Sequence, residues 1–231
     1  MNLKTKKRLL IISALILLCL FISFFVYWQK ENRGDQEQIE PPKEEKRTDN
    51  FSPVSKHPGN ESEYTIDLKL EPDGLFHIQS SVNIKNTSSD NWDELVFYFI
   101  PNMFTEKNSP ERSEPATHQF DQVTVNGNAC DFQLKEDTLR IPLSENLKPD
   151  QEVEVQFNYE LTLPKEGLRF TKIDENYYLS QFYPMLATYR DHQWNKEPYQ
   201  DRGETYHTAF SNFKLNYEIP DDYTRRFPSF V

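Results

Sequence analysis

The chain has 231 residues, with 26 Lys and Arg against 37 Asp and Glu, and a formal net charge of −11. This acidic balance disfavours the phosphate backbone, so we expect no nucleic-acid partner. Only two cysteines are present, Cys19 in an apolar segment and Cys130 far from it. A disulfide scaffold is therefore excluded, and the fold must rely on a hydrophobic core rich in Phe and Tyr.

The N-terminal segment predicts one membrane-spanning helix. Residues 1–8 form a basic tip, and residues 9–28 carry no formal charge and end in Tyr27 and Trp28. A helix of that length spans about 30 Å, the thickness of a hydrocarbon core. The basic tip predicts a single-pass protein of the cell membrane with a cytoplasmic N-terminus, lipid around residues 9–28, and an extracytoplasmic domain.

Three other interpretations of this segment are weaker. A cleaved signal peptide needs a small-x-small site, which the sequence Tyr27-Trp28-Gln29-Lys30 does not offer. A lipoprotein signal needs a small residue before the modified cysteine, but Leu18 precedes Cys19. A buried core helix would show an amphipathic pattern, and this run shows none. We therefore expect an uncleaved anchor.

Residues 29–62 predict a flexible stalk. They are rich in Glu, Lys, Asn and Pro, with Pro41-Pro42, Pro53 and Pro58 interrupting any regular element. Such a composition buries too little apolar surface to offset the entropy of ordering the chain. The stalk is expected to hold the following domain away from the membrane.

Residues 63–224 predict an all-β domain, a layered sheet or sandwich. Apolar side chains alternate with polar ones, as expected of strands with one buried face. The continuous apolar run 95–100 indicates an inner strand, and Asn126-Gly127 indicates a hairpin turn. The expected strands cover residues 64–70, 76–84, 95–100, 123–125, 132–134, 139–143, 153–163 and 210–219, and residues 225–231 form an atypical tail.

No complete catalytic or metal site is recognisable. The sequence lacks HExxH and G-x-S-x-G motifs, and its six glycines form no phosphate-binding loop. The histidines make no i, i+4 pair; His192 and His207 flank one loop, but a zinc site needs a third ligand. We therefore expect structural roles for all five histidines, and no catalytic residue, metal ligand or cofactor. The five are His57, His77, His118, His192 and His207.

Residues 177–223 form the most informative stretch, because they mix aromatic, proline and polar residues in a long loop that then enters a strand. Loops of this kind on a β scaffold often line binding clefts. The same composition also suits a large loop that merely packs on the domain. Both interpretations stay open from the residues alone.

This stretch resembles the N-terminal domain of the aminopeptidase N-type (gluzincin) zinc metallopeptidases. The resemblance runs from about residue 64 to 224, and it depends on the order and spacing of several short motifs. These are Trp92-Asp93-Glu94-Leu95, Pro101-Asn102, Gly167-Leu168-Arg169-Phe170, Ser180-Gln181-Phe182-Tyr183-Pro184, Ala187-Thr188-Tyr189-Arg190, Trp194-Asn195, Pro198-Tyr199 and Gly203-Glu204-Thr205-Tyr206.

The resemblance implies a saddle-like β-domain that covers a catalytic domain and helps to bind the free amino group of a peptide. Gln181 is the residue that matches the family's binding glutamine. Tyr183 stands where the family often has an acidic or amide residue. Zinc is implied only for the full-length family, whose HExxH helix and glutamate ligand follow this domain.

The resemblance therefore implies a fragment of a membrane-anchored aminopeptidase, through gene truncation or frameshift, that is not catalytic alone. Its partners would be a catalytic domain or a peptide N-terminus. The alternative is a stand-alone, surface-anchored β-sandwich that binds a ligand without chemistry. Downstream DNA that encodes HExxH and a glutamate ligand would favour the first interpretation over the second.

Overall fold

The computed structural model describes residue 23 and residues 59–167, 169–200, 202–203 and 205–224. The predicted tip 1–8, the anchor 9–28 apart from Ser23, most of the stalk and the tail 225–231 lie outside these residues. Within the described part of the chain, no helix is long and apolar enough to cross a bilayer.

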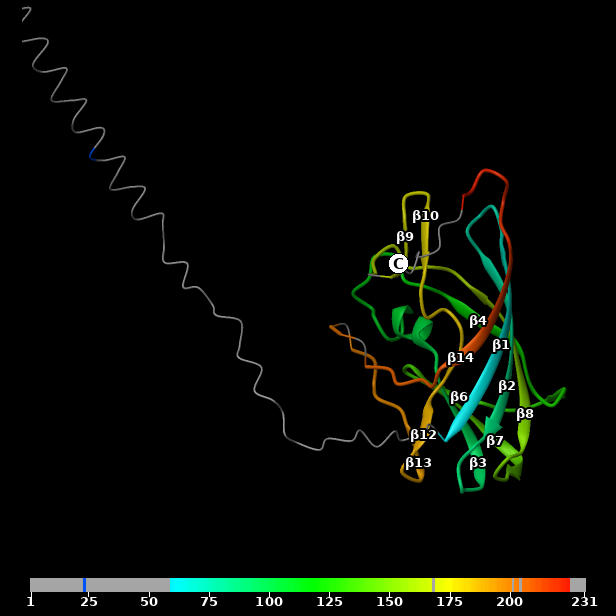
Figure 1. Ribbon diagram of the computed structural model, residues 1–231. Helices are drawn as coiled ribbons and strands as arrows, with labels where there is room; N and C mark the ends of the chain where they lie inside the picture. The colour runs from blue at the N-terminus through cyan, green and yellow to red at the C-terminus, as the bar shows by residue number, and fades with distance from the viewer. Residues whose placement is uncertain (1–22, 24–58, 168, 201, 204, 225–231) are drawn as a thin grey trace, which may run out of the picture. The chain divides into compact units, whose positions relative to one another are not determined.

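The predicted all-β class is confirmed: the described residues form a sandwich-like arrangement of two larger sheets and two hairpins (Figure 1). The six-stranded sheet has the order β14-β1-β2-β8-β4-β5, and the four-stranded sheet has the order β11-β3-β7-β6. A short 3-10 helix, η1 (Ile100–Phe104), follows β3. The strands of the first sheet are β14 (Ser211–Glu218), β1 (Asn60–Leu70), β2 (Phe76–Asn86), β8 (Glu152–Leu161), β4 (His118–Val125) and β5 (Asn128–Ala129), and those of the second are β11 (Met185–Leu186), β3 (Trp92–Tyr98), β7 (Thr138–Leu147) and β6 (Gln133–Lys135).

The period-two pattern places one face of the six-stranded sheet in the core. In β2, buried and more exposed residues alternate from Phe76 to Asn86, and β8 alternates in the same way. The register aligns Val82 with Tyr64 on β1 and with Val155 on β8, and all three side chains are buried. A slip of one residue would turn this apolar set outward, so burial fixes the register.

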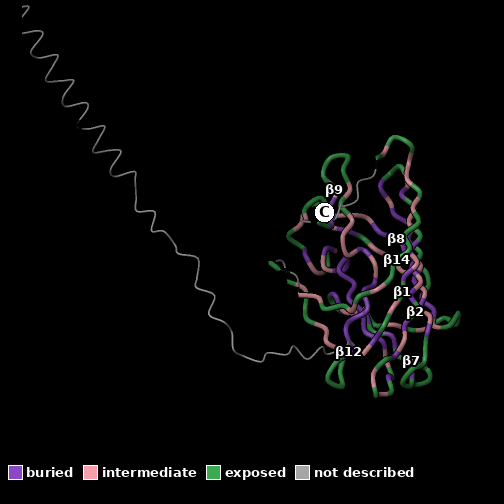
Figure 2. The backbone as a smooth tube through the Cα atoms, in the orientation of Figure 1, coloured by how far each residue is buried: buried purple, intermediate pink, exposed green. Residues whose placement is uncertain are grey.

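The predicted inner strand is confirmed over residues 95–98, where β3 is buried on both faces, but the strand ends at Tyr98 and Ile100 begins η1. Leu95 to Phe99 are fully buried. Phe97 meets Phe157 of β8 edge to face, with ring centroids 5.3 Å apart, and this contact joins the two sheets. Figure 2 shows buried backbone concentrated inside the domain and exposed backbone at its loop tips.

Strand β14 has a position that its sequence pattern does not indicate. It pairs in parallel with β1, from Ser62 opposite Ser211 to Lys69 opposite Glu218, and it forms one edge of the sheet. Alternation predicts a buried face containing Phe213 and Leu215, but these side chains are 53% and 41% exposed. This exposure fits the edge position, because β14 has a neighbouring strand on one side only.

Strand β1 begins at Asn60, within the segment assigned to the stalk from composition. Asn60 is fully buried, and its Oδ1 accepts a hydrogen bond from the backbone N–H of Tyr189 at 2.8 Å. The partner lies 129 residues further along the chain. Composition could not reveal this start, because the stabilising contact is distant in sequence.

The stretch 177–223 contains short strands rather than one long loop. Two hairpins lie in or beside it: β9 (Phe170–Ile173) with β10 (Asn176–Leu179), and β12 (Thr188–Arg190) with β13 (Gln193–Asn195). The rings of the motif residues Tyr189 and Trp194 meet edge to face, with centroids 5.2 Å apart. The ring centroids of Trp92 and Trp194 are 4.8 Å apart. These motif residues therefore pack a core that links distant segments.

Candidate functional site

The loop that contains Gln181 connects β10 and β11, and its backbone is held from two sides. Gln181 is half-buried and has a φ of 59°, in the left-handed region that non-glycine residues seldom adopt. The N–H of Ser180 donates to the carbonyl of Arg169 at 2.9 Å, and the hydroxyl of Tyr159 donates to the carbonyl of Phe182 at 2.8 Å. These bonds hold an uncommon conformation at the residue predicted to bind a ligand.

Tyr183 supports this loop through its ring. It packs against Tyr64 and Phe213, with centroid distances of 5.3 Å and 5.5 Å. Burial raises the pKa of Tyr183 to about 12, so its hydroxyl stays protonated at neutral pH. Tyr183 therefore cannot supply the negative charge of an acidic residue at this position.

An exposed apolar edge lies beside the loop. Phe213 stacks on Tyr64 at 4.9 Å with an interplanar angle of 8°, which connects the edge to the aromatic support of the loop. Phe210 is fully exposed, and Phe213 and Leu215 are largely exposed on β14. We call Phe210, Phe213 and Leu215 the apolar edge. Clustered exposed apolar side chains of this kind often mark an interaction surface.

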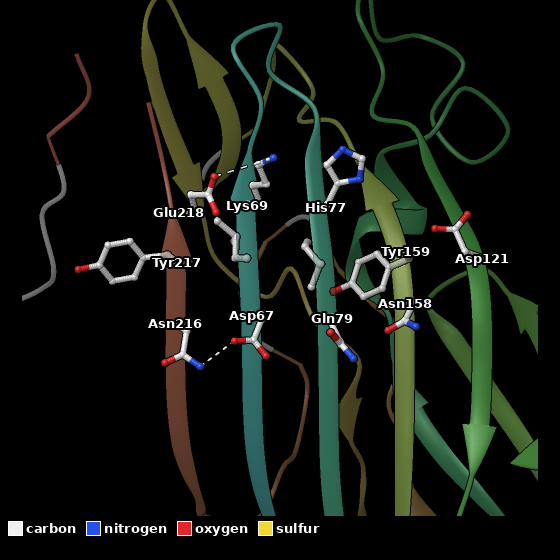
Figure 3. Close-up of a pocket in the computed structure, with 12 residues that line it drawn as sticks. Asp67, Lys69, His77, Gln79, Asp121, Asn158, Tyr159, Asn216, Tyr217 and Glu218 are labelled. Atoms are coloured by element: carbon white, nitrogen blue, oxygen red, sulfur yellow. Dashed lines mark hydrogen bonds and ion pairs between the residues drawn. The ribbon is translucent and has the colours of Figure 1, made fainter. Parts of the chain in front are cut away.

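A polar groove crosses the outer face of the six-stranded sheet (Figure 3). The strand register places Asn216, Asp67, Gln79 and Asn158 in one row over four adjacent strands. Asn216 Nδ2 donates to Asp67 Oδ1 at 2.7 Å, and the groove encloses about 500 Å³. Such a row of amides and carboxylates offers hydrogen bonds to a polar ligand, although it also suits a solvated sheet face.

The next row on these strands brings basic side chains close to carboxylates. Nζ of Lys69 lies 3.9 Å from Oε1 of Glu218, and Nδ1 of His77 lies 3.2 Å from Oε1 of Glu160. His77 is on the side of β2 opposite the buried Phe76 and Ile78. His77 therefore lies on the partly exposed face of β2.

A second hollow, of about 650 Å³, contains His192 and Asp90. Nδ1 of His192 lies 2.9 Å from Asp90 Oδ2, and the hydroxyl of Tyr189 donates to the same oxygen at 2.9 Å. The bond from Tyr189, followed by the bond and charge of His192, lowers the pKa of Asp90. The carboxylate thus orients the exposed imidazole of His192. The two residues are 102 positions apart, so no sequence pattern relates them.

His207 does not join His192 in a metal site. Its backbone takes the structural role: the N–H donates to the Tyr98 hydroxyl at 3.1 Å, and the carbonyl accepts from the Thr188 side chain at 2.9 Å. Within the described ranges, no group of three His, Cys, Asp or Glu side chains is arranged to hold a metal ion.

We expect acidification to destabilise the domain through His118. Its Nε2 lies 2.8 Å from Asn102 Oδ1, its Nδ1 is buried with no hydrogen-bond partner among the described residues, and burial lowers the pKa of its ring. The unfolded state therefore binds the proton more readily, so the free energy of unfolding falls as pH drops through about 6.5. Guanidinium unfolding of wild type and His118→Gln at several pH values checks this. If the free energy of unfolding changed with pH equally in both proteins, the expectation would be contradicted.

A buried polar cluster around Lys196 was not indicated by any sequence pattern. Nζ of Lys196 contacts Oδ1 of Asp137 and lies 4.9 Å above the ring of Tyr98. Oδ2 of Asp137 accepts the backbone N–H of Tyr199 at 2.8 Å. The two charged residues are 59 positions apart, so only the fold brings them together.

Comparisons with known proteins give remote similarities only. No family model matches the sequence. No curated protein sequence matches it. An M1 zinc metallopeptidase from Deinococcus radiodurans superposes with a TM-score of 0.34 and 12% identity, over 50% of this chain and 25% of that chain. A two-domain M1 zinc metallopeptidase mutant bound to L-tryptophan superposes with a TM-score of 0.32 and 13% identity, over 46% of this chain and 21% of that chain. The match spans a quarter or less of those enzymes, and it assigns the chain to no family.

Proposed function

We propose that this chain is the saddle-like N-terminal β-domain of a membrane-anchored zinc aminopeptidase, and that Gln181 binds the free amino group of the peptide. The observation that carries the proposal is the Gln181 loop itself. It matches the binding loop of the resembled family in sequence, and its left-handed backbone is held in place by Tyr159 and Arg169.

The physical basis is preorganisation. A glutamine Oε1 accepts hydrogen bonds from an ammonium group, and a loop fixed before binding loses less entropy when the ligand arrives. The apolar edge beside the loop supplies a surface on which a catalytic domain would pack. In the resembled family the zinc ligands and the catalytic base belong to the catalytic domain, and the 231 residues contain no HExxH motif.

The proposal includes the anchor at residues 9–28, with the β-domain outside the cell. Protease added to intact cells is then expected to release the domain, because the polar stalk is the accessible connection. Complete protection of the domain until the membrane is lysed would contradict this orientation.

The role of Gln181 is tested by fusing the domain to the catalytic domain of a zinc aminopeptidase. Gln181→Ala is expected to weaken substrate binding by about 1–3 kcal/mol, the cost of a lost buried hydrogen bond. KM and kcat for an aminoacyl chromogenic substrate provide the measurement.

Gln181→Gly is the matched control for the backbone, since glycine adopts a φ of 59° without strain. It should lose binding as alanine does but leave the loop conformation relaxed. Unchanged kinetics in both variants would remove the role of Gln181.

A second function is favoured by the polar groove. A stand-alone binding module would use the row of Asp67, Gln79 and Asn158 to hold a polar ligand. Asn158 Oδ1 is buried and has no hydrogen-bond partner within the described residues, so it could accept a bond from such a ligand. Under this alternative, ligand retention by the intact chain depends on Asp67 and Asn158 and is insensitive to Gln181.

A further inference from the structure

The side chains of Lys196 and Asp137 meet in the interior of the domain. They are 7% and 2% exposed, and Nζ of Lys196 contacts Oδ1 of Asp137. The ring of Tyr98 covers the amine at 4.9 Å. Ammonium and carboxylate groups are rarely buried so completely, because each loses its hydration.

The backbone beside both residues is held by hydrogen bonds. Asp137 forms the turn between β6 and β7, where its carbonyl accepts the N–H of Phe99 at 2.7 Å. Beyond Lys196, the N–H of Glu197 donates to the hydroxyl of Tyr98 at 3.1 Å. The two side chains therefore meet on anchored backbone segments, and such proximity favours a reaction between two groups over the same reaction in solution.

The surroundings shift Lys196 toward its neutral form. Burial lowers the pKa of Lys196, although Asp137 and Glu136 oppose this shift, while Arg140 adds to it. A neutral, desolvated lysine amine is a nucleophile, whereas an ammonium is not. A reaction between the two groups starts from the neutral pair, in which one proton has moved from Lys196 to Asp137 to give an amine and a carboxylic acid.

We propose that Lys196 and Asp137 join in an intramolecular isopeptide bond. The lone pair of Nζ attacks Cγ of Asp137, and the bond between Nζ and Cγ forms. The bond between Cγ and Oδ1 breaks, and Oδ1 leaves as water with the carboxyl proton and one amine proton. The products are one neutral amide and one water molecule, with no oxidant or reductant.

The contacts of Asp137 suit this reaction. Oδ1 faces the amine and is the leaving oxygen, whereas Oδ2 accepts the N–H of Tyr199 at 2.8 Å. That N–H stabilises the negative charge that develops on Oδ2 during attack. In the product, Oδ2 is the amide oxygen and keeps the same hydrogen bond.

The bond would connect the turn between β6 and β7 to the segment after β13. It closes a covalent loop around residues 137–196, which contains the Gln181 loop. An isopeptide bond at this place would keep the hairpins of that region attached to the domain even when other contacts open. The described residues contain one cysteine, Cys130, so two of them cannot form a disulfide that would supply such a constraint.

The test is the intact mass of the full chain, purified in detergent and then denatured. We expect a mass lower by one water molecule than the sequence requires, in any expression host, because the reaction needs no enzyme. Tandem mass spectrometry should find one branched peptide that joins residues 137 and 196, and trypsin should fail to cleave after Lys196.

Two variants assign the site. Asp137→Asn should lose ammonia in place of water, and Lys196→Arg should have the full mass. Lys172→Arg is the matched control, because Lys172 also lies 4.9 Å above a tyrosine ring but is not part of this pair. It should keep the loss of water.

Two outcomes would overturn the proposal. One is a full, unmodified mass in the wild-type chain together with tryptic cleavage after Lys196, which would leave an ordinary buried ion pair. The other is a loss of water that persists in Lys196→Arg, which would place the dehydration elsewhere, for example in a succinimide at Asp73-Gly74.

Discussion

Replacing Phe97 with alanine is expected to lower the free energy of unfolding of the β-domain by about 3–5 kcal/mol. Phe97 is fully buried on β3, and its ring meets Phe157 of β8 at 5.3 Å. The change removes apolar contact and leaves a cavity between the two sheets, where the close packing of both strands limits collapse. Guanidinium unfolding followed by the fluorescence of Trp92 and Trp194 measures the loss.

Phe213→Ala is the matched control, because it makes the same chemical change on β14 at a side chain that is 53% exposed. Its cost should be clearly smaller, because the half-exposed ring stacks on Tyr64 but buries much less apolar surface than Phe97. Equal losses for both variants would show that the two sheets do not share the core described above.

Asp137→Ala is expected to lower the free energy of unfolding by about 3–5 kcal/mol, because it leaves the buried charge of Lys196 without its partner. The change also leaves the N–H of Tyr199 without its acceptor. If the side chains are joined as an amide, the variant also loses that covalent link, so the direction is the same. The free energy of unfolding is again the quantity to measure.

Glu94→Ala is the control for this second prediction. It breaks the pair between Arg140 and Glu94, whose side chains are 45% and 32% exposed, and should cost at most about 1 kcal/mol. Asp137→Ala combined with Lys196→Met should recover part of the loss, since no charge remains buried. If Asp137→Ala cost no more than Glu94→Ala, the pair would not be buried in solution.

Much of the fold could be predicted from local pattern. Alternation in β1, β2 and β8 indicated which side chains face the core, because a strand exposes opposite faces at successive residues. The continuous apolar run at β3 likewise indicated burial on both faces. For β14 the same rule gave the wrong exposure, because alternation does not show whether another layer covers the strand.

The candidate site was less accessible to sequence reasoning. The resemblance led to Gln181, but its φ of 59° accompanies hydrogen bonds that its two neighbours make with distant residues. The carbonyl of Phe182 accepts from Tyr159, and the N–H of Ser180 donates to Arg169. The pairing of Asp90 with His192 and that of Asp137 with Lys196 join residues on separate elements. No spacing rule relates such residues, because the chain between them follows the whole domain.

The sequence alone determined that residues beyond the stalk form β-strands around an aromatic core, since period-two hydrophobicity reports a strand and its buried face. Tertiary structure alone decided that β14 lies parallel to β1, where Ser62 and Ser211 meet across 149 positions. It also decided that a lysine and an aspartate are buried against each other. The physical reason is range: hydrophobic periodicity acts between neighbours, whereas strand order and buried polar contacts are selected by the free energy of the complete packed domain.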